Sequence, residues 1–353
     1  MRKIAIFGTG KCAERIYTCL TSVADDNIVS LFCRTNATKD EMFHNLKVLD
    51  INEIDENIRK DLVMIIAIYD RETVMEIKDQ LLKLRFTFEQ IIEIDSFAFD
   101  DLIASLEKNE IEKRYICPCC KHHIKWFLPA GEEWAGLFKK YHIIGGGRRE
   151  NVICPVCNTI DRTRWQYYVI KYFTDILKRR CNVLHIAPEE VICRTIQDNP
   201  QCDYYAGDIE VGKAQHICDL TDIQFKDKFL DYVIANHVLE HIKEIDLALH
   251  EIKRVLKDDG KLIISFPICM DMRTKEETTP LNEEERLDQF GQKDHVRLFG
   301  YDYKEYFEGY GFKVDILSPK NILDLDEIKT YGLIEDDVIL ICSKGEETSD
   351  IWI

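Results

Sequence analysis

The chain has 353 residues, of which 46% are hydrophobic and 31% are charged, a balance typical of globular domains with buried cores. No apolar run approaches the roughly 20 residues that a membrane helix needs, and the opening MRKIAIFGTGK lacks a signal-peptide pattern, so we expect a cytoplasmic protein. Its net charge of −17 argues against a nucleic-acid partner, because proteins that grip phosphates usually carry a basic face. A small molecule or another protein is the expected partner.

Residues 1–105 alternate strand-like and helix-like stretches. The pattern predicts strands over 3–8, 27–33, 62–68 and 90–94, and helices over 11–20 and 72–85. Apolar strands that alternate with helices indicate a parallel sheet covered on both faces.

The first turn of this region carries a nucleotide-binding pattern. Gly8, Gly10 and Ala13 match G-x-G-x-x-A between a strand and a helix. The end of the next strand has Arg34 where an acid is usual, and an arginine can meet a 2′-phosphate. One hypothesis is therefore an NAD(P)-dependent oxidoreductase, and another is a turn that needs its glycines without any ligand.

Residues 106–160 form a linker and a loop-rich segment with two C-x-x-C pairs. Cys117 and Cys120 make one pair, and Cys154 and Cys157 make the other. Two such pairs can bring four thiolates to one tetrahedral zinc, which would be a closed, structural site. The alternative is four unrelated buried cysteines. The 14 cysteines of a long chain without a signal peptide do not indicate a disulfide framework.

Residues 161–353 return to alternating strands and helices. We expect helices over 164–179 and 246–260, and strands over 182–186, 203–207, 215–218, 230–236, 261–268, 313–317 and 337–343. The strand over 182–186 runs into Ala187, Pro188 and Glu189, a turn without glycine.

Polar residues follow the next strands in order. Asp208 follows the second strand of this region and can take both hydroxyls of a ribose, and Asp219 follows the third and can accept an adenine amino group. Asn236 and His237 end the fourth strand, where they can pack under a cofactor.

This order resembles the class I S-adenosylmethionine-dependent methyltransferases over about residues 161–345. DLTDIQFKDKFLDYVIANHVLEHI and HEIKRVLKDDGKLIISFP carry the resemblance. The succession CPCC, CPVCNTIDRTR, VLHIAPE and FGQKDHVRLFGYDY resembles a bacterial subgroup with a zinc-ribbon insert. The resemblance implies an α/β protein with a Rossmann-like accessory domain (1–105), a linker and zinc-ribbon-like segment (106–160) and a seven-stranded, doubly wound methyltransferase sheet (161–353).

The resemblance also implies S-adenosylmethionine as the cofactor. Because this cofactor has no phosphate, its turn does not require the glycines that a pyrophosphate needs. Ala187 allows a close turn, Pro188 suits the first helical position, and Glu189 or Glu190 can meet the ammonium group. The expected cofactor-binding residues are His185, Ala187, Pro188, Glu189, Asp208, Asp219, Leu220, Asn236 and His237.

Methyl transfer needs alignment of the acceptor and exclusion of water, and a base only for a protonated acceptor. His295 and Arg297 are the favoured substrate-side residues, with His237 as a further catalytic candidate and His241 as an alternative that more often has a structural role. Asp294 is expected to orient their loop.

Residues 1–95 resemble the small nucleotide-sugar-binding module of some bacterial sugar acyltransferases. The resemblance implies a sugar or nucleotide-sugar as the small-molecule acceptor. Two further alternatives are a nucleotide-sugar-binding protein and a non-enzymatic protein whose zinc segment contacts a partner. The sequence predicts no oligomeric state.

Overall fold

The computed structural model describes residues 3–107, 115–131 and 137–345, and the chain folds into two compact units. The first unit comprises residues 1–127 and 154–158, and the second comprises residues 128–153 and 159–353. Residues 108–114 of the predicted linker lie outside the described residues.

The first unit contains a six-stranded sheet in the order β3-β4-β2-β1-β5-β6. Its strands are β1 (Lys3–Phe7), β2 (Val29–Arg34), β3 (Met42–Phe43), β4 (Leu46–Asp50), β5 (Leu62–Ile66) and β6 (Ile91–Glu93). All neighbours pair in parallel except β3 and β4. Its helices are α1 (Lys11–Val23), α2 (Glu56–Lys60), α3 (Arg71–Lys83) and α4 (Phe97–Glu107), with 3-10 turns η1 (Ile51–Glu53) and η2 (Phe88–Gln90).

Alternate residues of the strands face opposite layers, as strand geometry requires. Ile4 and Ile6 pack with apolar residues of α1 and α4, whereas Ala5 and Phe7 pack with residues of α3. The expected parallel sheet with both faces covered is therefore present. A short hairpin of β7 (Tyr115–Ile116) and β8 (His123–Ile124) joins the α1 and α4 layer.

The second unit contains the expected seven-stranded sheet, in the order β14-β13-β12-β15-β16-β21-β20. Its strands are β12 (Cys181–Ile186), β13 (Cys202–Asp208), β14 (His216–Ile217), β15 (Leu230–Asn236), β16 (Leu256–Ser265), β20 (Phe312–Leu317) and β21 (Ile339–Lys344). Strand β21 runs antiparallel to both neighbours, and the other pairs are parallel.

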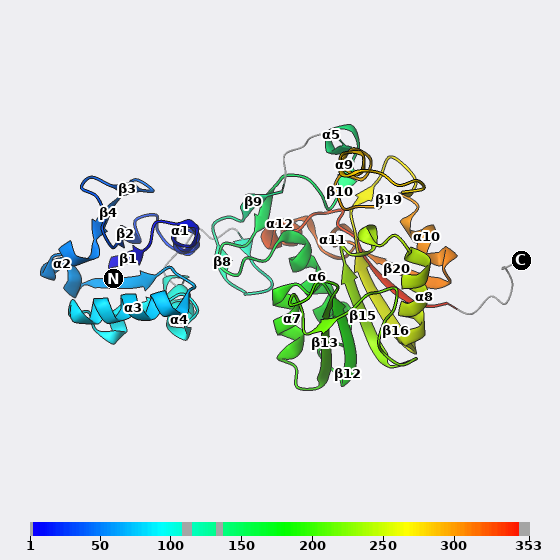
Figure 1. The fold of residues 1–353 in the computed structure, drawn as a ribbon, viewed down its shortest axis with the longest axis horizontal. Helices are drawn as coiled ribbons and strands as arrows, with labels where there is room; N and C mark the ends of the chain where they lie inside the picture. The colour runs from blue at the N-terminus through cyan, green and yellow to red at the C-terminus, as the bar shows by residue number, and fades with distance from the viewer. Residues whose placement is uncertain (1–2, 108–114, 132–136, 346–353) are drawn as a thin grey trace, which may run out of the picture. The chain divides into compact units, whose positions relative to one another are not determined.

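Helices cover both faces of this sheet. Its helices are α6 (Asp161–Phe173), α7 (Glu190–Gln197), α8 (Ile245–Val255), α10 (Tyr303–Gly309), α11 (Pro319–Ile322) and α12 (Leu325–Tyr331). Figure 1 shows α6 and α7 on one side and α8 and α10 on the other, where α8 and α10 share an apolar core with the sheet. In the described part of the chain, no helix combines the length and the apolar character needed to cross a bilayer.

Smaller elements form a cap at the carboxyl ends of the parallel strands. A four-stranded sheet has the order β10-β17-β19-β18, and β9 pairs with β11. These elements are β9 (Leu128–Ala130), α5 (Leu137–Lys140), β10 (Ile143–Ile144), β11 (Arg149–Ile153), β17 (Ile268–Cys269), β18 (Lys275–Glu276), α9 (Glu283–Phe290) and β19 (Arg297–Gly300), beside the 3-10 turn η3 (Leu239–His241).

Three expectations differ from the structure. The helix expected over 246–260 ends at Val255, because residues 256–260 already belong to β16, where Leu256 pairs with Leu230. The helix expected over 164–179 spans Asp161–Phe173. The segment expected over 106–160 is divided, because residues 128–153 pack with the second unit while Cys154–Asn158 belong to the first.

Candidate functional site

The turn after β12 is held by a left-handed residue and an ion pair. Ala187 has φ 46°, and its N–H donates to the carbonyl of Gly207 at 2.8 Å. Helix α7 begins at Glu190 with Glu189 as its N-cap, so the prediction that Pro188 occupies the first helical position is wrong. Pro188 and Glu189 lead the chain out of the left-handed conformation at Ala187 before the helix starts at Glu190.

His185 and Glu189 face each other across this turn. His185 is fully buried, its Nε2 lies 2.8 Å from a Glu189 carboxylate oxygen, and its Nδ1 lies 3.0 Å from the Tyr204 hydroxyl. Burial favours the neutral carboxyl, but the contact with His185 outweighs it and holds the pKa of Glu189 below its ordinary value. His185 therefore fixes Glu189 from inside the sheet.

The other predicted cofactor residues gather at the same edge. Strands β13, β12 and β15 are parallel neighbours, so their carboxyl ends meet. Asp208 is the last residue of β13, is half-buried, and accepts the N–H of Glu210 at 2.8 Å. Asn236 ends β15 and is 6% exposed, and its Nδ2 has no hydrogen-bond partner among the described residues.

Asp219 and Leu220 follow β14 at one end of the sheet. Asp219 is exposed and accepts both the N–H and the hydroxyl of Thr221, at 2.8 and 2.7 Å. Leu220 is buried in the core beside it. One carboxylate thus lies at the end of β13 and one after β14, in the order predicted for acceptors of ribose hydroxyls and an adenine amino group.

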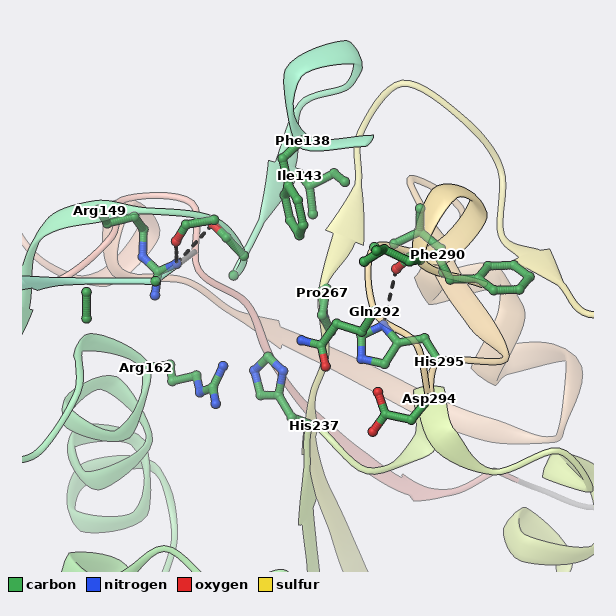
Figure 2. Close-up of a pocket in the computed structure, with 18 of the residues that line it drawn as sticks. Phe138, Ile143, Arg149, Arg162, His237, Pro267, Phe290, Gln292, Asp294 and His295 are labelled. Atoms are coloured by element: carbon green, nitrogen blue, oxygen red, sulfur yellow. Dashed lines mark hydrogen bonds between the residues drawn. The ribbon is translucent and has the colours of Figure 1, made fainter. Parts of the chain in front are cut away.

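A cavity of about 590 Å³ lies within the second unit. Its lining comes from parts of residues 130–152 and 287–298, together with Ile160, Arg162, His237 and Pro267. Figure 2 shows side chains of these segments converging on one space, with His237 at its base. Among the predicted cofactor residues, His237 is the one that lines this cavity, so it connects the carboxyl end of β15 to the cavity.

Two arginines on the cavity wall differ in their partners. The Arg149 Nε lies 2.8 Å from a carboxylate oxygen of buried Asp161, and its Nη1 donates to the carbonyls of Gly146 and Gly147 at 2.9 Å. In contrast, the guanidinium of Arg162 makes no hydrogen bond or ion pair with the described residues and points toward the His237 ring (Figure 2). Arg162 thus presents an unpaired cationic group to the cavity.

Of the predicted catalytic residues, His295 and His237 line the cavity and Arg297 does not. His295 is 3% exposed, and burial lowers the pKa of both histidines because it disfavours the imidazolium. Arg297 is buried, donates to the carbonyls of Leu239 and Ile242 at 2.6 and 2.8 Å, and pairs with Glu276. It fixes η3 rather than contacting a ligand.

The sequence interpretation assigned no role to Arg149, Arg162, Phe138 or Gln292, all of which line the cavity. Two signals pointed to this region: the run Gly145–Gly147, and the charged stretch DRTR at the start of α6. Neither has a hydrophobic period that would place it beside His237. Gly145 has φ 82°, and a Cβ there would lie 3.7 Å from the His237 ring.

The four predicted zinc ligands come together in the first unit. One sulfur from each of Cys117, Cys120, Cys154 and Cys157 lies within 4.8 Å of the others. In both pairs the N–H of the residue after the second cysteine, Lys121 or Asn158, donates to the carbonyl of the first, at 2.7 and 2.9 Å. Both of these residues have positive φ, so the two pairs form matching turns. Four convergent thiolates fit a tetrahedral zinc ion.

The N-terminal turn has the geometry that its glycines suggest. Gly8 has φ 122°, Gly10 is the N-cap of α1, and a Cβ at Gly8 would lie 3.5 Å from Ala13. Arg34 makes two contacts of 2.8 Å with the carboxylate of Glu41. The residue expected to meet a 2′-phosphate is therefore engaged by an acid of its own unit.

Comparison with known proteins finds similarities for part of the second unit. Residues 171–264 match the family model described as a methyltransferase domain. A demethylmenaquinone methyltransferase of Streptomyces avermitilis is 34% identical over 82 residues, which cover 21% of this chain and 36% of that protein. An uncharacterized protein of Methanocaldococcus jannaschii is 41% identical over 66 residues, covering 18% of this chain and 28% of that protein. The matched segments thus span about a third of these relatives.

Solved structures show weaker likenesses. The PH0226 protein from Pyrococcus horikoshii is 18% identical with a TM-score of 0.34, covering 52% of this chain and 91% of that chain. A SAM-dependent methyltransferase from Aquifex aeolicus is 15% identical with a TM-score of 0.33, covering 50% of this chain and 87% of that chain. The second unit is therefore similar to a methyltransferase domain over residues 171–264, which include the central strands of its seven-stranded sheet.

Proposed function

We propose that the chain transfers a methyl group from S-adenosylmethionine to a small molecule bound in the cavity above His237. The observation that carries this proposal is the position of His237, which directly follows the central strand β15 and also lines the cavity. When bound, the cofactor supplies a methyl group on a sulfonium, which is transferred by in-line displacement.

The chain's own groups suit this binding mode. Asp208 would hold the ribose hydroxyls, Asp219 the adenine amino group, and the buried amide of Asn236 a cofactor acceptor atom. Glu189 is fixed by His185 close to the turn, where its charge favours an ammonium. The carboxylates at two strand ends and the unpaired amide at a third would together complement the polar groups of the cofactor.

Arg162 indicates the class of acceptor. Its guanidinium lines the cavity without a protein partner, and arginine forks match carboxylates and phosphates. We therefore propose an acceptor with an anionic group, which includes the sugar or nucleotide-sugar that the resemblance of residues 1–95 suggests. Gly8 and Gly10 support the first unit as a nucleotide-binding accessory module with a Rossmann-like role.

Calorimetric titration with S-adenosylmethionine tests the cofactor step. The full-length, zinc-replete protein should bind it, and Asp208→Ala should weaken binding at least about tenfold through the loss of charge-assisted hydrogen bonds. Asp222→Ala, an exposed aspartate nearby, removes the same charge and should leave affinity unchanged. Folded wild-type protein that produces no binding heat would refute the proposal.

The proposal includes a structural zinc at the four cysteines and a cytoplasmic location. All fourteen cysteines are free in the structure, which fits a reducing compartment. Oxidoreductase chemistry in the first unit is the less favoured function, because Glu41 occupies the guanidinium of Arg34. Tight NADPH binding that depends on Gly10 would revive it.

A further inference from the structure

A buried carboxylate beside the cavity lacks the partners that burial demands. Glu240 is 1% exposed, and neither of its carboxylate oxygens has a hydrogen-bond partner among the described residues. The Nδ1 of His237 lies 3.4 Å from one oxygen, too far for a good hydrogen bond. A carboxylate removed from water without compensation is unfavourable, so it calls for a further partner.

Two imidazoles approach the same point. His241 and His295 each offer a ring nitrogen, and these nitrogens and a Glu240 oxygen all lie within 4.8 Å of one another. The two rings meet edge to face, with centroids 4.7 Å apart. The backbone brings them together, because the N–H of Val296 donates to the carbonyl of Glu240 at 2.9 Å.

Each histidine is oriented by a second group, as metal-binding histidines usually are. The Nδ1 of His295 lies 3.2 Å from the carbonyl of Phe290 (Figure 2), and the Nδ1 of His241 lies 3.1 Å from the carboxylate of Asp294. A proton on each Nδ1 satisfies these acceptors and leaves the lone pair on Nε2. Arg297 adds rigidity, since it holds the carbonyls that flank η3.

We propose that Glu240, His241 and His295 bind a divalent cation, whose remaining coordination positions take an oxygen atom of the acceptor. A carboxylate with two imidazoles suits first-row divalent metals with open positions. His295 lines the cavity, and the His241 side chain is 34% exposed, so an ion and a ligand both have access. The site would hold and orient an acceptor hydroxyl in the cavity. This inference rests on the proposed function, because it assigns the cavity to the acceptor.

Titration of the full-length, zinc-replete protein with Mn²⁺ alone, followed by the electron paramagnetic resonance of the free ion, tests the site. Mn²⁺ prefers oxygen and nitrogen ligands, so it should leave the thiolate cluster to zinc, and the zinc content is measured in parallel. We expect one bound Mn²⁺ per chain and affinity at least about tenfold weaker in Glu240→Gln. Glu244→Gln, an exposed glutamate four residues away, is the matched control and should bind as the wild type.

His241→Gln is the second variant, because its partly exposed side chain is replaced without opening the core. If Glu240→Gln does not fold, as judged by circular dichroism, His241→Gln decides. Absence of bound Mn²⁺ in the wild type, or equal affinity in the wild type and both site variants, overturns the metal site. S-adenosylmethionine calorimetry separates the two proposals: Mn²⁺ binding without cofactor binding refutes the proposed function alone, and cofactor binding without Mn²⁺ refutes the metal site alone.

Discussion

The imidazole of His185 and the carboxylate of Glu189 lie 2.8 Å apart and bracket the left-handed residue Ala187. One partner belongs to the buried strand β12 and the other to the start of α7. The contact stabilises the left-handed conformation of a turn that has no glycine to adopt it freely.

Substitutions at Ala187 test the conformation of this turn. A non-glycine residue in the left-handed region costs roughly 1–2 kcal/mol. Glycine avoids this cost, but its larger entropy in the unfolded chain cancels part of the gain. Ala187→Gly should therefore be as stable as the wild type or up to about 1 kcal/mol more stable, with unchanged cofactor affinity. Ala187→Val should lose about 1–3 kcal/mol and weaken binding. Urea unfolding and calorimetry measure both, and a valine variant as stable as the wild type would contradict the geometry.

Loss of a thiolate should release the metal from the first unit. Cys154→Ser should reduce zinc from one ion per chain to a substoichiometric level, because four ligands close the site. The segments around both cysteine pairs should then exchange their amide hydrogens faster. Cys119→Ser changes a neighbouring cysteine outside the four-sulfur cluster and should keep the zinc. Equal zinc content in both variants would argue for four unrelated cysteines.

Burial raises the pKa of Asp337 to about 7, with Asp161 nearby adding to the effect. The folded state then keeps a proton that the unfolded chain releases above about pH 4, so the contribution to stability is present at low pH and is lost as pH rises toward 7. Asp337→Asn removes this slope. Relative to the wild type, the variant should gain about 2–3 kcal/mol between about pH 5 and pH 8. Urea unfolding at both pH values measures it, with the half-buried Asp336→Asn, next to it in sequence, as control; parallel slopes in all three proteins would disprove the shift.

Arg162 should act on the acceptor and not on the cofactor. Arg162→Gln removes the unpaired guanidinium of the cavity and should raise the KM for an anionic acceptor at least about tenfold. The affinity for S-adenosylmethionine should stay within about twofold. A panel of anionic and neutral sugars, assayed with radiolabelled methyl donor, identifies the acceptor and allows the comparison. If the methylated acceptor is neutral and its KM is unchanged in the variant, Arg162 has no role in recognition.

A buried arginine of the second unit, Arg164, should contribute strongly to its stability. Arg164 is fully buried and donates to the carbonyls of Asn151, Val152, Thr159, Tyr331 and Gly332. Arg164→Met leaves these acceptors unsatisfied and should cost at least about 3 kcal/mol in the free energy of unfolding. Arg180→Met, at an exposed side chain, should cost less than about 0.5 kcal/mol.

The sheets could be predicted because their strands are apolar runs, and β12, β15 and β21 lie where the pattern placed them. The end of α8 could not be predicted, because residues 256–260 continue the helical pattern as a polar helix end. In the structure, the pairing of Leu256 with Leu230 makes them part of a strand. The cysteine cluster followed from spacing alone. The cavity did not, because its walls come from loops whose side chains have no period.

The chain passes between its two units more often than a linear arrangement of domains requires. It leaves the first unit after Phe127, returns at Cys154 for five residues, and leaves again after Asn158. A shortened protein that starts at residue 161 would therefore lack the loop 130–152, and with it one wall of the cavity. Transfer of the second unit into another protein, in the laboratory or during evolution, therefore requires a breakpoint before residue 128. The transferred segment then includes the second cysteine pair, Cys154 and Cys157.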